Sequence, residues 1–225
     1  MDKMDFIFNE KKIAGRLKQL DSPERISMHH EYFVNSAVIF LIIPYQERPY
    51  DLVLIRRTKQ INDKHSGEMS FPGGKFDLNQ DKSYLDTALR ELREELGIPG
   101  NNVTILGCID DHLTPKGFII TAFVAYINKD QKMIKQVGEV EEIVKIPITF
   151  FANKKNFKEK TYKLKEDLIG VGKFNYRSPN NKRYVIFGAT SHIIVNFLDT
   201  IYNLGLMILG CRRITCEDIK DKIIN

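Results

Sequence analysis

The sequence predicts an α+β fold in which a central mixed β-sheet lies between helical layers. Residues 36–44 form a nearly continuous apolar run, as expected for a strand that is covered on both faces. The expected elements then follow in the order strands, helix, strands, helix. This order allows one sheet to be covered by helices on both sides.

The first part of the chain is expected to form a helix and a hairpin. Residues 9–20 have helical spacing. Residues 52–57 form the expected hairpin partner of the apolar run, across a turn at residues 46–50. Residues 68–71 are a short strand that leads into Gly73 and Gly74, where the absence of side chains lets the backbone approach a ligand closely.

The second part of the chain alternates between strands and polar segments. Four further segments are expected to be strands: residues 103–110, 119–126, 142–146 and 184–187. The polar stretch 151–183 is expected to be a hairpin or loop over the site rather than core. Residues 189–204 are a second strong helix.

The central helix has clear signals at both ends. Ser83, followed three residues later by Asp86, resembles a capping box, so the helix is expected to begin near Ser83. Gly97, followed by Pro99, is a good stop signal. Leucine and alanine residues of this helix form one stripe that is expected to face the core.

A second stripe of the same helix is acidic. Glu91, Glu94 and Glu95 project from one side, because residues three and four apart on a helix are neighbours. Their charges repel, and a bound cation would relieve that repulsion. Carboxylate and carbonyl oxygens, without nearby thiolate or imidazole, suit Mg²⁺ or Mn²⁺. The alternative is a solvated acidic face with Arg90 and Arg93 as ordinary ion-pair partners.

Residues 90–98, Arg-Glu-Leu-Arg-Glu-Glu-Leu-Gly-Ile, resemble the box of the Nudix hydrolases at every position of its core. The general box places thirteen residues between its glycine and its arginine, whereas Gly74 and Arg90 enclose fifteen. Gln80 or Asp81 falls where the general box has its first glutamate, so neither is given a role. The resemblance implies an α/β/α sandwich with a central mixed sheet.

The upstream segment 54–77 is similar to the one that marks the coenzyme A pyrophosphatase branch of that family. The matching residues are Arg57, His65, Gly67, Phe71, Pro72, Gly73, Gly74 and Asp77. Further similarity at residues 114–127, 139–151 and 184–194 extends the resemblance over residues 35–204. We therefore expect a Nudix domain at 35–204, an N-terminal helical extension at 1–34 packed on it, and a C-terminal tail at 205–225.

The expected catalytic residues follow from the chemistry of phosphoanhydride hydrolysis, in which divalent ions neutralise charge and align a water molecule. We expect Glu91 and Glu95 to be metal ligands, with Glu94 as a third and the Gly74 carbonyl as a further contact. The resemblance implies that Arg90 holds a box carboxylate in place.

The general base is expected to be an acid of the helix or one further along the chain. Glu139 and Glu142 match acidic positions of the branch, and the sequence does not separate them. The alternative is that they only begin a strand with solvated charge.

The expected substrate contacts lie in three loops. Gly73 and Gly74 are expected at the substrate, and Arg57 is suited to hold a pyrophosphate by two hydrogen bonds, with an edge ion pair as the alternative. His65 either contacts substrate or shapes its loop. Lys116 is a phosphate partner unless its segment is a plain turn.

The resulting hypothesis is hydrolysis of coenzyme A or a derivative to 4′-phosphopantetheine and adenosine 3′,5′-bisphosphate, with Mg²⁺ or Mn²⁺. One alternative is a pyrophosphatase for another nucleoside diphosphate derivative, such as ADP-ribose, NADH or a nucleoside triphosphate. Another is a non-catalytic nucleotide sensor, although a binder has no need of three mutually repelling acids.

Composition narrows the partners and the compartment. The net charge of +5 suits small anionic nucleotides and is weaker than a dedicated nucleic-acid binder usually shows, so no nucleic-acid partner is expected. Cys108, Cys211 and Cys216 form no CxxC, and the first ten residues do not resemble a signal peptide, so we expect a cytoplasmic protein. Polar residues within 192–209 argue against a membrane span. Monomer and homodimer both stay open.

Overall fold

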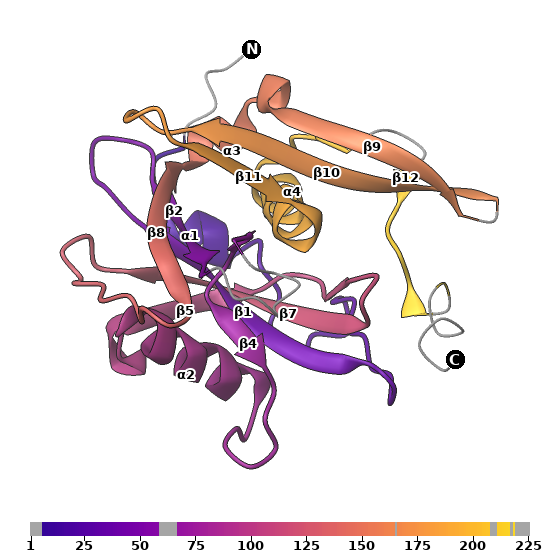
Figure 1. The fold of residues 1–225 in the computed structure, drawn as a ribbon, viewed down its shortest axis with the longest axis horizontal. Coiled ribbons are helices and arrows are strands. Elements are labelled where there is room, and N and C mark those ends of the chain that lie inside the picture. The colour runs from indigo at the N-terminus through magenta and orange to yellow at the C-terminus, as the bar shows by residue number, and fades with distance from the viewer. Residues whose placement is uncertain (1–5, 59–66, 165, 208–210, 217, 219–225) are drawn as a thin grey trace.

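A computed structural model describes residues 6–58, 67–164, 166–207, 211–216 and 218. Within these residues the chain forms two β-sheets and four α-helices (Figure 1). The helices are α1 Glu10–Ala14, α2 Tyr84–Leu96, α3 Ile148–Ala152 and α4 Gly188–Tyr202, with short 3₁₀ turns η1 Gly100–Asn102 and η2 Lys154–Asn156.

The central sheet is mixed, as the sequence predicted. Its strands are β1 Val34–Ile43, β2 Asp51–Arg57, β3 Met69–Ser70, β4 Gly73–Lys75, β5 Val103–Cys108, β6 His112–Leu113, β7 Phe118–Ile127 and β8 Val140–Pro147. β1 pairs in parallel with β7 and antiparallel with β2 and β4, while β8 pairs antiparallel with β2. The predicted hairpin of β1 and β2 is therefore confirmed.

Apolar side chains cover both faces of this sheet. On one face Ile39 and Leu41 of β1 pack with Leu92 of α2 in one buried cluster. On the other face Phe40 of β1 packs in a second cluster, which includes Phe197 of α4, with the two rings stacked 4.2 Å apart. The sheet thus lies between α2 and α4 (Figure 1), and the predicted sandwich is confirmed.

A second sheet lies beyond α4 (Figure 1) and is called the outer sheet below. It consists of β9 Phe157–Leu164, β10 Asp167–Arg177, β11 Arg183–Phe187 and β12 Cys211–Arg212. The hairpin predicted within 151–183 is present, but the expectation that this stretch lies outside the core was wrong. Phe174 of β10 is fully buried, because alternate residues of a strand point to one face and that face meets α4.

The two long helices that the sequence predicted, α2 and α4, are present. The N-terminal helix α1 is shorter than the predicted helix at residues 9–20. α2 begins after Ser83, whose side chain accepts a hydrogen bond from the Asp86 amide, and it ends at Gly97 in a left-handed conformation (φ 66°). α1 ends at Ala14, and residues 9–20 do not form one helix because Lys18 instead forms a β-bridge with Cys108. None of the described helices has the length and apolar character needed to cross a membrane.

Candidate active site

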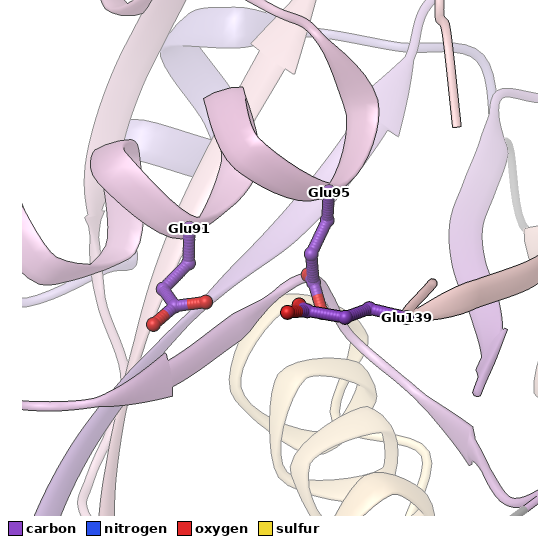
Figure 2. Close-up of side chains that lie close together, drawn as sticks. All are labelled: Glu91, Glu95 and Glu139. Carbon is purple, nitrogen blue, oxygen red and sulfur yellow. The ribbon is translucent and has the colours of Figure 1, made fainter. Parts of the chain in front are cut away.

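Three carboxylates converge beside α2 (Figure 2). Glu91 and Glu95 project from the helix, and Glu139 reaches them from the turn that precedes β8. One oxygen from each carboxylate lies within 4.8 Å of the other two. This set, called the carboxylate cluster below, joins two segments that are more than forty residues apart in the sequence.

The turn that carries Glu139 is fixed by main-chain hydrogen bonds on two sides. The Gln136 amide donates to the Glu95 carbonyl at the end of α2, with an N···O distance of 2.9 Å. The Thr58 amide, just beyond β2, donates to the Glu139 carbonyl at 2.8 Å. Glu139 is therefore held between the end of the helix and the end of β2, while its side chain stays exposed.

The diglycine turn forms the floor of the cluster. The Gly73 amide donates to Oε2 of Glu95 at 3.0 Å. The Glu91 carboxylate lies against Gly74, where any Cβ would overlap it. Gly73 itself has a φ of 149°, and a Cβ there would overlap the backbone of Ala37 in β1. Glycine is therefore required at Gly73 by its conformation and the nearby backbone, whereas a Cβ at Gly74 would displace the Glu91 carboxylate.

Burial makes the cluster electrostatically unfavourable as it stands. Glu95 is only 1% exposed, and burial raises its pKa to about 8; the Gly73 amide opposes this, and the Glu91 charge adds to it. Burial likewise raises the pKa of Glu91. These crowded oxygen donors, with the pKa raised at Glu91 and Glu95, fit a divalent cation such as Mg²⁺ or Mn²⁺, because its charge would favour the ionised carboxylates.

Arg90 binds the acids around it rather than facing open solvent. Its Nε and Nη2 donate to the two oxygens of Asp81 at 2.8 and 3.1 Å, and its Nη1 donates to Glu91 at 2.9 Å and to Glu94 at 3.1 Å. Arg90 thus lies where the family resemblance implies, beside a carboxylate of the helix.

Asp81 is the residue whose role the sequence left open. Besides the two bonds from Arg90, it accepts hydrogen bonds from Thr87 Oγ1 at 2.9 Å and from the Asp77 amide at 2.9 Å. Its bonds with Arg90 are the largest cause that holds its pKa at about 2, so it stays ionised. Asp81 therefore anchors Arg90. The only sequence signal was its approximate alignment with the first glutamate of the general box.

Two of the predicted acids lie outside the carboxylate cluster. Glu94 is 46% exposed and pairs with Arg90. Glu142 accepts hydrogen bonds from Tyr184 and Lys182, next to the outer sheet. Glu142 pairs with Arg56 of β2. It therefore lies within β8, beyond the turn that carries Glu139.

The predicted substrate contacts differ in how close they lie to the carboxylate cluster. Arg57 ends β2, and its charge is among those that lower the pKa of Glu95, so it lies near the cluster. Lys116 is exposed in the turn between β6 and β7. His65 lies outside the described residues. The roles of Arg57, Lys116 and His65 remain predictions.

Comparison with known proteins gives a family for this arrangement. A family model described as the NUDIX domain matches residues 34–168. Relatives include an uncharacterized Nudix hydrolase, NudL, from Yersinia pestis, which is 32% identical over 131 residues, or 58% of this chain and 65% of the relative. The match therefore spans slightly less than two thirds of the length of that relative.

The chain is also similar to solved structures, among them the following two. A MutT/nudix family protein from Enterococcus faecalis is 16% identical, with a TM-score of 0.47, over 80% of this chain and 66% of that one. The NUDIX domain of Shewanella oneidensis NrtR, complexed with ADP ribose, is 19% identical, with a TM-score of 0.42, over 58% of this chain and 80% of that one.

The raised pKa of Glu95 predicts how stability depends on pH. The folded protein keeps a proton up to a pKa of about 8 that the unfolded chain releases near 4.5. Stability without metal should therefore fall as pH rises from 6 to 8, and Glu95→Gln should remove much of that fall. Thermal unfolding at both pH values measures this, since about 1 kcal/mol shifts Tm by about 2–4 °C in a protein of this size.

Manganese should reverse the trend, because protons and metal compete for the same oxygens. MnCl₂ should raise Tm more at pH 8 than at pH 6 in the wild type and much less in Glu95→Gln. Glu94→Gln, a matched change outside the cluster, should keep most of the response. An equal loss in both variants would mean that the cluster alone does not define the metal site.

Gly74→Ala should disturb the cluster without unfolding the protein. The new methyl group would occupy the place of the Glu91 carboxylate and push it away from Glu95. We expect Mn²⁺ affinity, measured by calorimetric titration, to fall by about tenfold or more, as one ligand is displaced. Gly100→Ala is the control, since its methyl group would meet Leu89 at an ordinary 3.6 Å. Unchanged affinity in Gly74→Ala would refute this role for the diglycine turn.

Proposed function

The chain belongs to the NUDIX family, and we propose that it hydrolyses the pyrophosphate bond of coenzyme A or a close derivative. The products would be 4′-phosphopantetheine and adenosine 3′,5′-bisphosphate. The observation that supports the reaction class is the convergence of Glu91, Glu95 and Glu139 within 4.8 Å, beside the backbone of Gly73 and Gly74.

The proposed reaction needs oxygen ligands, a fixed geometry and a proton acceptor. Bound at the cluster, a divalent cation would offset the charge that builds on the phosphate oxygens and help to align the attacking water. Glu91 and Glu95 would hold it. Arg90 donates a hydrogen bond that holds the Glu91 carboxylate in position, and Asp81 in turn accepts a hydrogen bond that holds Arg90.

Glu139 is our candidate for the general base. It would take a proton from water as the water oxygen bonds to phosphorus and the bridging P–O bond breaks. Its side chain is exposed yet lies beside Glu91 and Glu95, whereas Glu142 is held by Tyr184 and Lys182. The structure thus favours Glu139 of the two acids that the sequence left open.

The substrate proposal rests on sequence resemblance and on charge. Phe71, Pro72, Gly73 and Gly74 fit the segment of the coenzyme A pyrophosphatase branch, and β1 pairs with both glycines in the structure. The net charge of +5 suits an anionic substrate. Cys108 is a buried free thiol, which agrees with the proposal of a reducing cytoplasm.

The proposal is tested by assaying the purified protein with Mg²⁺ or Mn²⁺ against coenzyme A, acetyl-coenzyme A, ADP-ribose, NADH and a nucleoside triphosphate. We expect the highest kcat/KM for coenzyme A or its acyl form, with both products identified by mass spectrometry. A clear preference for ADP-ribose would reject the substrate and keep the reaction class. No cleavage of any compound would reject both.

A matched pair of variants tests the assignment of Glu139. Glu139→Gln should lower kcat by about 10²-fold or more, in the range typical of a lost general base, with a Tm no lower than that of the wild type. Glu142→Gln makes the same chemical change three residues away and should leave kcat within a few-fold. The reverse order would transfer the role to Glu142.

A further inference from the structure

The outer sheet has one covered face and one face that is exposed except at Ile169, which is 4% exposed. Phe174, Tyr184 and Ile186 are buried on the side of α4. Their sequence neighbours Asn175, Val185 and Phe187 are exposed, as expected because alternate residues of a strand point to opposite faces. In Figure 1 the outer sheet forms one boundary of the molecule, with α4 beneath it.

Strand pairing gathers basic side chains on the exposed face. Lys173 of β10 pairs with Lys158 of β9 on one side and Phe187 of β11 on the other. Arg177 of β10 pairs with Arg183 of β11, and both lie on the same face as Lys173, because alternate residues of a strand point to one face. We call this surface the basic face, and its basic residues are Lys158, Lys160, Lys173, Arg177 and Arg183.

The charge of the basic face is not neutralised locally. Across the described part of the chain, none of its five basic side chains forms an ion pair with a carboxylate. Asp167, at the far end of β10, is engaged by Arg212 at 2.7 Å. Five positive charges on one face, in a chain of net charge +5, create a positive surface that attracts a polyanion.

Exposed aromatic and apolar groups lie among these charges. Tyr162 is 55% exposed, Val185 48% and Phe187 44%. Tyr162 lies on β9 and Phe187 on β11, so the two rings lie on either side of β10. Basic side chains between exposed aromatic rings on an open sheet are the combination that binds phosphates and stacks unpaired bases.

We propose that the basic face binds single-stranded nucleic acid. Lysine and arginine side chains would contact phosphates, while Tyr162 and Phe187 would stack on bases. An anionic membrane fits less well, because the apolar groups are few and are separated by charges rather than gathered at one protruding edge. The sequence suggested no nucleic-acid partner because these residues are spread over three strands and form a patch only after strand pairing.

This site is separate from the proposed active site. α4 and the central sheet lie between the basic face and α2, which carries Glu91 and Glu95 (Figure 1). Binding of nucleic acid and hydrolysis of a small nucleotide can therefore be tested independently. Substitutions on the basic face are expected to leave hydrolysis unchanged.

The test is fluorescence anisotropy with labelled 12-nucleotide oligo(U) and oligo(dT), using the full chain at 50–200 mM NaCl. The slope of log K against log [NaCl] should be negative, at about −0.7 per phosphate contact, and so near −3.5 if all five basic residues engage. Lys158→Ala with Lys173→Ala should make the slope shallower by about 1.4. Phe187→Ala should weaken binding about tenfold with little change in slope.

The control is Lys129→Ala with Lys132→Ala, two exposed lysines in the segment after β7, which should bind like the wild type. Vesicles containing 30% phosphatidylserine are assayed in parallel. The proposal is overturned if neither oligonucleotide binds at 50 mM NaCl or if the control pair weakens binding as much as the basic-face pair. It is also overturned if the vesicles, and not the oligonucleotides, depend on Lys158 and Lys173.

Discussion

The burial of Glu95 beside the carboxylates of Glu91 and Glu139 is the constraint on which the site depends. The fold holds these groups together, and it buries Glu95 almost completely. Such an arrangement opposes folding unless a proton or a cation compensates the charge. Apolar packing on both sides of the central sheet supplies the stability that lets the chain keep this cluster.

Each part of the cluster is positioned by a different element. Packing of Leu92 and Leu96 against the sheet fixes the rotation of α2, and therefore the direction of Glu91 and Glu95. Pairing of β4 with β1 places Gly73 and Gly74 beneath those carboxylates. The turn at Gln136 then brings Glu139 over the end of the helix. A small displacement of any of the three would separate the oxygens.

The sequence predicted the elements whose signals are local. Ser83 and Gly97 mark the ends of α2, and the apolar run of β1 needs no long-range information. The choice between Glu139 and Glu142 could not be predicted, because it depends on where β8 begins against β2. The sequence also did not predict that Asp81 anchors Arg90. The loop between Gly74 and Arg90 is longer than in the general Nudix box, so Asp81 does not have the spacing of the usual first glutamate. The basic face depends on the register of three strands.

The most direct measurement is anomalous X-ray diffraction from crystals grown with MnCl₂ above the pKa of Glu95, near pH 8.5. We expect a manganese peak in contact with carboxylate oxygens of Glu91 and Glu95 and within reach of Glu139, beside Gly74. A well-ordered cluster with no peak, or a peak bound only by Glu94 or Glu142, would contradict the account.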